Sequence, residues 1–197
     1  MKSVLISIKP KYVALIASGE KTIEVRKTRP KLETPFKCYI YCTIGNGMKG
    51  DYLVPSNIQC GKVIGEFVCH EIDEFYVYKN GAVQYWNCHN LEKSCLAYNE
   101  ISNYVGKGKM GYAWSIYDLK IYDKPKELSE FRTVDLQAVR KCESREQSYF
   151  DGYCNNGGCL KCGFYCSKKE DWCDKCKTKP ITRPPQSWCY VEGQDER

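Results

Sequence analysis

Three charged side chains stand close together near the start of the chain, at Lys21, Glu24 and Arg26. The guanidinium of Arg26 offers a planar set of donors that fits a phosphate or a carboxylate. Lys21 supplies a point charge for phosphate or a general base, and Glu24 can polarise a water or accept from the amino group of a base. The spacing predicts a ligand-binding site; catalysis by Lys21 and Glu24 and an inert ion-pair network are the alternatives.

Six of the 14 cysteines gather between residues 154 and 176 and include two C-x-x-C pairs. Two thiolates at positions i and i+3 converge on one ion, and two such pairs complete a tetrahedral zinc site. The sequence therefore predicts a structural zinc ion held by Cys159, Cys162, Cys173 and Cys176. The neighbouring Cys154 and Cys166 are further candidate ligands, either for a second ion or in a different set of four. An iron–sulfur cluster is the minor alternative.

Positive charge is concentrated in the first part of the chain. The net charge is +6, and residues 1–37 hold nine Lys or Arg against three acidic residues, which accounts for all of it. So local an excess indicates an anionic partner, and nucleic acid is favoured over a membrane surface because no basic amphipathic helix accompanies it. A solvated lysine-rich surface is the alternative.

Aromatic side chains are abundant, with 16 tyrosines and four tryptophans. Aromatic rings provide stacking surfaces for unpaired bases. Tyr112 and Trp114 alternate with small residues and so share one strand face, and Tyr98 is near the start of an expected helix. We therefore include these three residues in the candidate nucleic-acid-binding set, with a place in the core or at its rim as the alternative.

Local patterns indicate the elements that must position Lys21. Residues 4–8 are typical of a buried strand, Pro10 suits the first turn of a helix, and Gly19 can end that helix in the left-handed conformation. Residues 22–26 alternate strictly between polar and apolar. This alternation predicts a strand with two residues facing the core, Ile23 and Val25, and three on the other side, Thr22, Glu24 and Arg26.

The rest of the chain is rich in short strands. Strands are expected at residues 36–43, 62–70, 75–78, 83–86, 112–122 and 183–192. Residues 96–105 are expected to form a short helix, residues 123–125 a turn, and residues 132–150 a helix. Many short strands with brief helices indicate an α+β, mainly β protein built on a small, partly closed β-barrel.

Composition excludes several classes of protein. An apolar fraction of 43% can build a core, which argues against wholesale disorder. No run approaches the roughly 18 apolar residues of a membrane span, so we expect no membrane partner. The N-terminus lacks a signal-peptide pattern, and we expect a cytoplasmic protein, in which clustered cysteines favour a metal over disulfides.

Residues 19–26, Gly-Glu-Lys-Thr-Ile-Glu-Val-Arg, match the pattern G-x-K-x-x-E-x-R. With this pattern the chain resembles the ASCH domain family, a branch of the PUA-like β-barrels, and within it the phage-type members. Flanking segments in the same order carry the resemblance further, namely residues 5–10, 61–67, 112–128 and 183–191.

The resemblance implies a PUA-like barrel formed by residues 1–131 and 181–194, with a basic cleft lined by Lys21, Thr22, Glu24 and Arg26. RNA or a modified nucleoside is the implied partner. Residues 132–180 are then an inserted helical and Cys-rich module that holds the zinc.

The resemblance also implies an alternative activity, because the family includes proteins similar to ribonucleases and to amidohydrolases of acetylated cytidine. A hydrolase of this kind would use Lys21 and Glu24. Glu24 stands where the amidohydrolases carry their nucleophilic threonine, which disfavours covalent deacetylation. A protein-interaction adaptor built on the zinc module is a further alternative.

Overall fold

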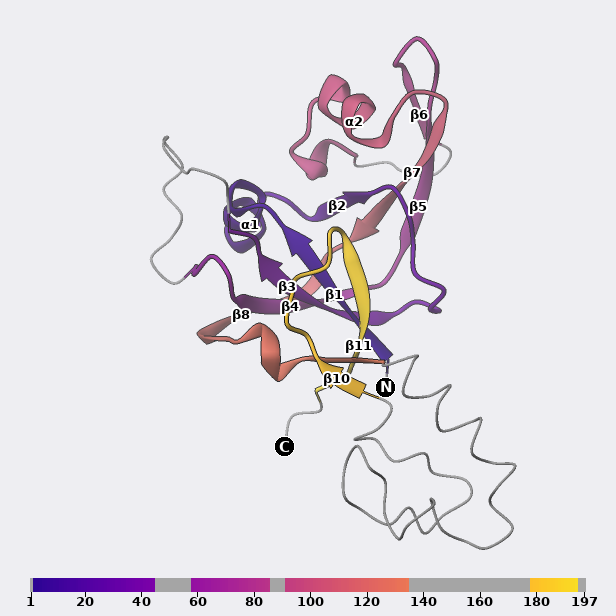
Figure 1. The fold of residues 1–197 in the computed structure, drawn as a ribbon. Helices are drawn as coiled ribbons and strands as arrows, with labels where there is room; N and C mark the ends of the chain where they lie inside the picture. Colours follow the sequence, from indigo (N-terminus) through magenta and orange to yellow (C-terminus); the bar gives the residue numbers. More distant parts are fainter. Residues whose placement is uncertain (1, 45–57, 86–90, 135–177, 195–197) are drawn as a thin grey trace, which may run out of the picture. The chain divides into compact units, whose positions relative to one another are not determined.

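The computed structural model describes residues 2–44, 58–85, 91–134 and 178–194 (Figure 1). Its packing divides the chain into two units, one formed by residues 1–128 and 183–197 and the other by residues 129–182. Within the part of the chain that the structure describes, no helix has the length and apolar character needed to cross a membrane.

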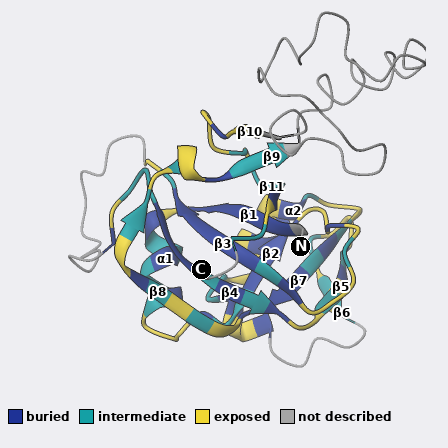
Figure 2. Cartoon of the chain, turned by 90° about the horizontal axis from the view of Figure 1, so that it is seen from below, coloured by how far each residue is buried: buried dark blue, intermediate teal, exposed yellow. Residues whose placement is uncertain are grey.

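The first unit contains a five-stranded sheet in the order β11-β1-β3-β4-β8. Only β1 and β3 run parallel; the other neighbours are antiparallel. Figure 2 shows β1 and β3 buried along most of their length, whereas β8 is largely exposed or half-buried. The strands are β1 (Lys2–Ile8), β3 (Phe36–Cys42), β4 (Val63–Cys69), β8 (Tyr117–Lys126) and β11 (Trp188–Glu192).

A second, antiparallel sheet has the order β2-β7-β5-β6. Its edge strand β2 carries Glu24 and Arg26, and Lys21 lies just before that strand. Its strands are β2 (Ile23–Arg26), β5 (Ile72–Val77), β6 (Val83–Tyr85) and β7 (Lys109–Ser115).

The two sheets meet at a corner, because β4 continues into β5 and β7 continues into β8. Ser115 fastens this corner: its N–H donates to the carbonyl of Glu71 (3.0 Å), and its Oγ accepts from the N–H of Glu71 (2.9 Å). Next to it, the N–H of Ile116 donates to the carbonyl of Thr22 (2.9 Å), across to the start of β2.

The mainly β class with short helices is confirmed, but the predicted barrel is not a closed one. The described strands form two open sheets joined at the corner, and the strand expected at residues 112–122 is two strands, β7 and β8, separated at Ile116. There the N–H of Ile116 bonds to the carbonyl of Thr22, the residue before β2, and does not continue the β5–β7 ladder.

The expected turn at residues 123–125 is wrong, because these residues belong to β8. Pro125 has no N–H to donate to a neighbouring strand, but β8 is at the edge of its sheet and tolerates this loss. The sequence did not predict that β8 extends through residues 123–125, because the Asp-Lys-Pro sequence there is also typical of a turn.

The main core lies on the inner face of the five-stranded sheet. Helix α1 (Pro10–Ala17) begins with Pro10 in its first turn, as predicted, and packs Val13 and Ile16 into this core. Residues from β1, β3 and β4 contribute alternate side chains, and Trp114 reaches in from β7. The helix is therefore held by its apolar face, which positions the turn that follows it.

A separate apolar cluster covers the opposite face of the second sheet. Val25, Phe75 and Ala113 supply the sheet side. The other side comes from the 3₁₀ helix η1 (Leu91–Ser94) and helix α2 (Tyr98–Val105), which Figure 1 shows beside β7. Helix α2 begins two residues later than the expected 96–105 segment, and the carboxylate of Glu100 accepts from the N–H of Ala97 at its start (2.8 Å).

The second unit contains the short antiparallel pair β9 (Arg132–Val134) and β10 (Thr178–Pro180), after the 3₁₀ turn η2 (Leu128–Glu130). The helix expected at residues 132–150 is therefore wrong over its first three residues. The remainder of that helix and the whole cysteine cluster at residues 154–176 lie outside the described residues. The predicted division into barrel and inserted zinc module stays a prediction.

Candidate functional site

The turn that follows α1 positions Lys21 in the site. Gly19 adopts a left-handed φ of +80°, and its N–H donates to the carbonyl of Ile16 (3.0 Å). The N–H of Lys21 then donates to the carbonyl of Leu15 (2.9 Å), so the turn doubles back on the helix end. The sequence signal for this turn, a glycine after the last apolar position, was sufficient to predict it.

The ammonium group of Lys21 is buried, with only 1% of the residue exposed. Its Nζ donates to the carbonyls of Ile23 (2.8 Å) and Ser94 (2.7 Å) and lies 3.2 Å from Oε2 of Glu24. The Nζ atom also lies 5.4 Å from the ring centroid of Tyr12. An ammonium has three N–H donors, and each has an acceptor here, which fixes Lys21 in place.

Strand β2 is buried on both faces. Val25 enters the apolar cluster beneath α2, as expected for a core-facing residue. Glu24 and Arg26 point to the other side, as the alternation predicts, but they are not on a solvated face: 7% of Glu24 and 5% of Arg26 is exposed. The carboxylate of Glu24 lies between the two cations, with Oε1 2.9 Å from Nη2 of Arg26.

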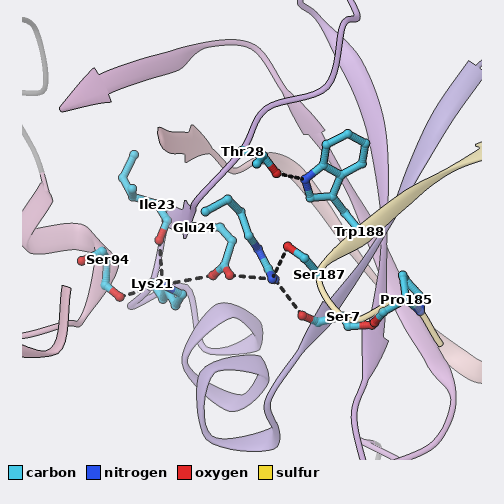
Figure 3. Close-up of polar contacts among 10 residues, drawn as sticks. Ser7, Lys21, Ile23, Glu24, Thr28, Ser94, Pro185, Ser187 and Trp188 are labelled. Carbon is cyan, nitrogen blue, oxygen red and sulfur yellow. Dashed lines mark hydrogen bonds and ion pairs between the residues drawn. The ribbon is translucent and has the colours of Figure 1, made fainter. Parts of the chain in front are cut away.

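The guanidinium of Arg26 reaches from β2 to the five-stranded sheet. Its Nη2 donates to the carbonyl of Ser7 in β1 (2.7 Å), and its Nη1 makes a longer contact with Oγ of Ser187 (3.4 Å). Figure 3 shows Ser7 and Ser187 converging on this group from one side and Glu24 from the other. The segment before β11 is held there by Oγ of Ser7, which donates to the carbonyl of Pro185 (2.7 Å).

The network brings two cations and one carboxylate together under cover, so it carries a net charge of +1. Among the described residues, two buried donors beside it have no partner: Nε of Arg26 and Nε1 of Trp114. A buried donor without an acceptor costs about 1–3 kcal/mol. The network therefore has more hydrogen-bond donors than acceptors and more positive than negative charge.

The aromatic candidates are placed in three different ways. Trp114 pairs with Glu24 across the β2–β7 ladder; it is fully buried, and its ring packs against Phe36 and Trp188. Tyr112 pairs with Arg26 on the same ladder and is half-buried. Tyr98 is exposed on α2, and its hydroxyl lies 2.8 Å from that of Tyr85, away from the charged motif.

Thr22 joins the network through its backbone. Its N–H donates to the carbonyl of Lys93 (3.0 Å) and its carbonyl accepts from the N–H of Ile116 (2.9 Å), so both bonds hold the chain at the start of β2. Sequence reasoning missed three contributors to the site, Ser7, Ser94 and Ser187. A serine within the apolar run of β1 was the one available signal, and it pointed to Ser7 alone.

The basic residues of the first 37 positions do not form one surface. Lys21 and Arg26 are buried, while Lys27, Arg29 and Lys31 are exposed on the loop that follows β2. This loop lies against β11, because Nε1 of Trp188 donates to Thr28 (3.1 Å) and the hydroxyl of Tyr190 accepts from the N–H of Lys31 (2.7 Å). The loop that carries these basic residues thus contacts two aromatic side chains of β11.

The predicted zinc ligands all lie outside the described residues. Within the described ranges, no group of three or more potential ligand side chains is arranged to hold a metal ion. The zinc prediction for the cysteine cluster stays a prediction.

No protein-family model and no curated protein matches the chain. Solved structures that match its fold include the ASCH protein of Zymomonas mobilis, at 17% identity and a TM-score of 0.46 over 96% of this chain and 87% of that one. A serine-to-alanine variant of that protein is 16% identical to this chain, with a TM-score of 0.48 over 96% of this chain and 88% of that one. A tyrosine-to-phenylalanine variant is 20% identical, with a TM-score of 0.47 over 65% of this chain and 77% of that one.

Proposed function

We propose that the chain is an ASCH-type, PUA-like protein that binds RNA or a modified nucleoside at the site formed by Lys21, Glu24 and Arg26. One observation carries the proposal: a buried network of net positive charge stands beside two buried donors, Arg26 Nε and Trp114 Nε1, that lack acceptors among the described residues. A ligand that brings an acceptor oxygen would satisfy them.

Stability alone is a weak reason for this network. Removing ions from water costs several kcal/mol per ion, and buried ion pairs are often no better for stability than apolar residues of the same volume. The network here also leaves donors unmatched, which adds to the cost. A binding role explains why charge is held in this position, because the ligand supplies what the protein lacks.

The chemistry of the site favours a ligand rich in acceptors. Phosphate oxygens and base carbonyls are both acceptors, and both occur in RNA. The exposed basic residues of the loop after β2, Lys27, Arg29 and Lys31, are suited to further phosphate contacts. Trp188 and Tyr190 lie beside that loop and are only half-buried, so they are better placed to stack on a base than the fully buried Trp114.

The hydrolase alternative is less well supported by the geometry. A general base needs a free lone pair within reach of substrate. Lys21 donates to three acceptors, and both oxygens of Glu24 are engaged by cations. These contacts suit positioning of Arg26 more than proton transfer. Turnover of RNA or acetylated cytidine by the wild-type chain, lost in Lys21→Ala, would instead establish the hydrolase.

The binding proposal is tested with single-stranded RNA oligonucleotides and free nucleosides, titrated at several salt concentrations. Affinity for RNA should fall steadily as salt rises, because phosphate contacts release counterions. Trp114→Phe keeps a ring but removes the unpartnered donor, and it should weaken binding about tenfold. Trp188→Phe is a comparison for loss of Nε1 alone: it keeps a ring for stacking and removes a donor that already has Thr28 as its acceptor, so it should weaken binding less than Trp114→Phe.

Two results would overturn the proposal. One is the absence of detectable binding of RNA and nucleosides at low salt by protein that circular dichroism shows to be folded. The other is binding that Trp114→Phe and Arg26→Lys leave unchanged, which would place the ligand elsewhere.

We also propose that Cys159, Cys162, Cys173 and Cys176 hold one structural zinc ion, with Cys154 and Cys166 available for a second. The support is their spacing alone. Metal analysis of purified protein should find about one zinc per chain. If deletion of residues 154–176 leaves RNA binding intact, the module serves another purpose, and a protein-interaction adaptor is then the favoured role for it.

A further inference from the structure

Two cysteines outside the charged site lie in contact at the open end of the β3–β4 pair. Cys42 is the last residue of β3, and Cys60 lies in the turn that leads into β4. Two backbone bonds hold that turn against the end of β3: the N–H of Gly61 donates to the carbonyl of Cys42 (2.8 Å), and the N–H of Cys42 donates to that of Lys62 (2.9 Å). The two cysteines are thus kept together by the sheet itself.

Their thiols contact each other directly. The Sγ atoms are 3.7 Å apart, with Cys42 donating to Cys60. Cys42 is fully buried, and burial followed by the neighbouring Cys60 raises the pKa of its thiol to about 12. Cys60 is half-buried, so it is the more exposed member of the pair.

We propose that Cys42 and Cys60 form a reversible disulfide by exchange with a low-molecular-weight disulfide such as oxidised glutathione. This inference is independent of the proposed ligand-binding function. Among the described cysteines, this is the pair with thiols in direct contact and one member accessible to solvent.

The exchange proceeds in two balanced steps. The Cys60 thiolate attacks one sulfur of the glutathione disulfide and forms a mixed disulfide. One glutathione leaves as the thiolate and takes up the proton that Cys60 lost. Cys42 then gives up its proton and, as the thiolate, attacks Sγ of Cys60, which closes the internal S–S bond and releases the second glutathione thiolate, which takes up a proton. Two protein thiols are oxidised, and one glutathione disulfide is reduced to two thiols.

The order of the two steps follows from the environments of the thiols. The thiolate is the attacking species, and at neutral pH the raised pKa of Cys42 leaves it almost entirely protonated. Cys60 is accessible and therefore reacts first. The internal bond then needs the two sulfurs to move from 3.7 Å apart to about 2.05 Å.

The bond would link the two ends of the segment formed by residues 43–59. A crosslink that closes a loop restricts the unfolded chain, so the oxidised protein should unfold at a higher temperature than the reduced protein. The site thereby couples the redox state of the surroundings to the stability of the β3–β4 pair.

The test treats the full-length protein with oxidised glutathione and maps cysteine linkages by peptide mass spectrometry. The expected product joins the peptides of Cys42 and Cys60, is two hydrogens lighter than the reduced pair, and disappears with dithiothreitol. In Cys42→Ser, the glutathione adduct on Cys60 should accumulate several-fold, because the second step is blocked.

Cys95 provides the matched control in the same sample. It is also half-buried, but its Sγ contacts the carbonyl of Glu20 (3.5 Å) rather than another thiol, so it should form a glutathione adduct without an internal link. The proposal is overturned if wild-type Cys60 stops at the mixed disulfide as Cys95 does, or if Cys42 links to a cysteine other than Cys60. The wild-type measurement decides this even if a variant fails to fold.

Discussion

Two sets of opposite charges in the first unit use the same residue types in different surroundings. The network of Lys21, Glu24 and Arg26 is almost completely buried. The pair of Arg29 and Glu74 is 3.6 Å apart, with 42% and 48% of its side chains exposed. Only two residues lie between Arg26 and Arg29 along the chain, so the difference arises from packing and not from sequence neighbourhood.

Burial changes what each charge requires. Water solvates Arg29 and Glu74 whether or not they touch, and such surface pairs contribute about 0–1 kcal/mol. The buried residues depend on fixed partners: Lys21 uses two carbonyls and a carboxylate, and Arg26 uses Ser7, Ser187 and Glu24. The buried network should therefore respond sharply to changes that the exposed pair tolerates.

The largest effect is expected for Glu24→Ala. The substitution leaves two cations buried beside each other with no carboxylate, and breaking a buried ion pair by removing one partner costs about 3–5 kcal/mol. Urea denaturation followed by circular dichroism measures the loss. Glu24→Gln, which keeps the volume and an acceptor oxygen, should recover part of it. A loss below 1 kcal/mol for Glu24→Ala would mean that water reaches the network.

A second prediction concerns groups that are buried without a charged partner. Burial raises the pKa of Cys69 to about 11 and that of Cys42 to about 12. These thiols stay protonated in the folded protein while the unfolded chain ionises, so their contribution is complete below about pH 8.5 and is lost as pH rises toward 11 or 12. The free energy of unfolding should fall by about 1.4 kcal/mol per pH unit for each thiol.

Cys69→Ala isolates this effect from the charged network. Between about pH 9 and 11, the free energy of unfolding of Cys69→Ala should fall less steeply with pH than that of the wild type, by about 1.4 kcal/mol per pH unit. Between pH 6 and 8 the two slopes should coincide. Equal slopes of wild type and Cys69→Ala above pH 9 would contradict the prediction.

A smaller effect is expected for Ser7→Ala, which leaves the buried charges in place but removes the bond from Ser7 Oγ to the carbonyl of Pro185. A single hydrogen bond contributes about 1 kcal/mol. Because that bond holds the segment carrying Ser187 beside Arg26, Ser7→Ala should also weaken RNA binding. Thermal denaturation and the RNA titration together check this, and an unchanged affinity would separate the segment from the site.

The smallest effect is expected for Glu74→Ala. Loss of its exposed pair with Arg29 should change the free energy of unfolding by less than about 1 kcal/mol, and added salt should remove the difference because it screens exposed charges. Urea denaturation in low and high salt measures both quantities. A large loss of unfolding free energy that persists in high salt would contradict the prediction that exposure makes this pair weaker than the buried network.

Local elements of the fold were largely predictable. Pro10 and Gly19 mark the two ends of α1, and strict alternation marks β2. The corner at Ser115 and Ile116 was not predictable, because nothing in the run of residues 112–122 interrupts its strand-like composition. Hydrogen bonds to Glu71 and Thr22, both distant in sequence, divide that run into β7 and β8.

The charged residues of the candidate site were predictable from the sequence, whereas their partners were not. Residue type and spacing singled out Lys21, Glu24 and Arg26, and the structure brings their side chains together. The surroundings that decide their chemistry come from far along the chain, 73 residues away at Ser94 and 161 residues away at Ser187.

The sequence by itself determined the local course of the chain around the motif and the kind of charge that it carries, because helix ends and strand alternation depend on neighbouring residues. Only the tertiary structure decided that this charge is buried and short of acceptors. Burial depends on two separate cores closing over the two faces of β2, and hydrogen-bond balance depends on which distant carbonyls then lie within reach.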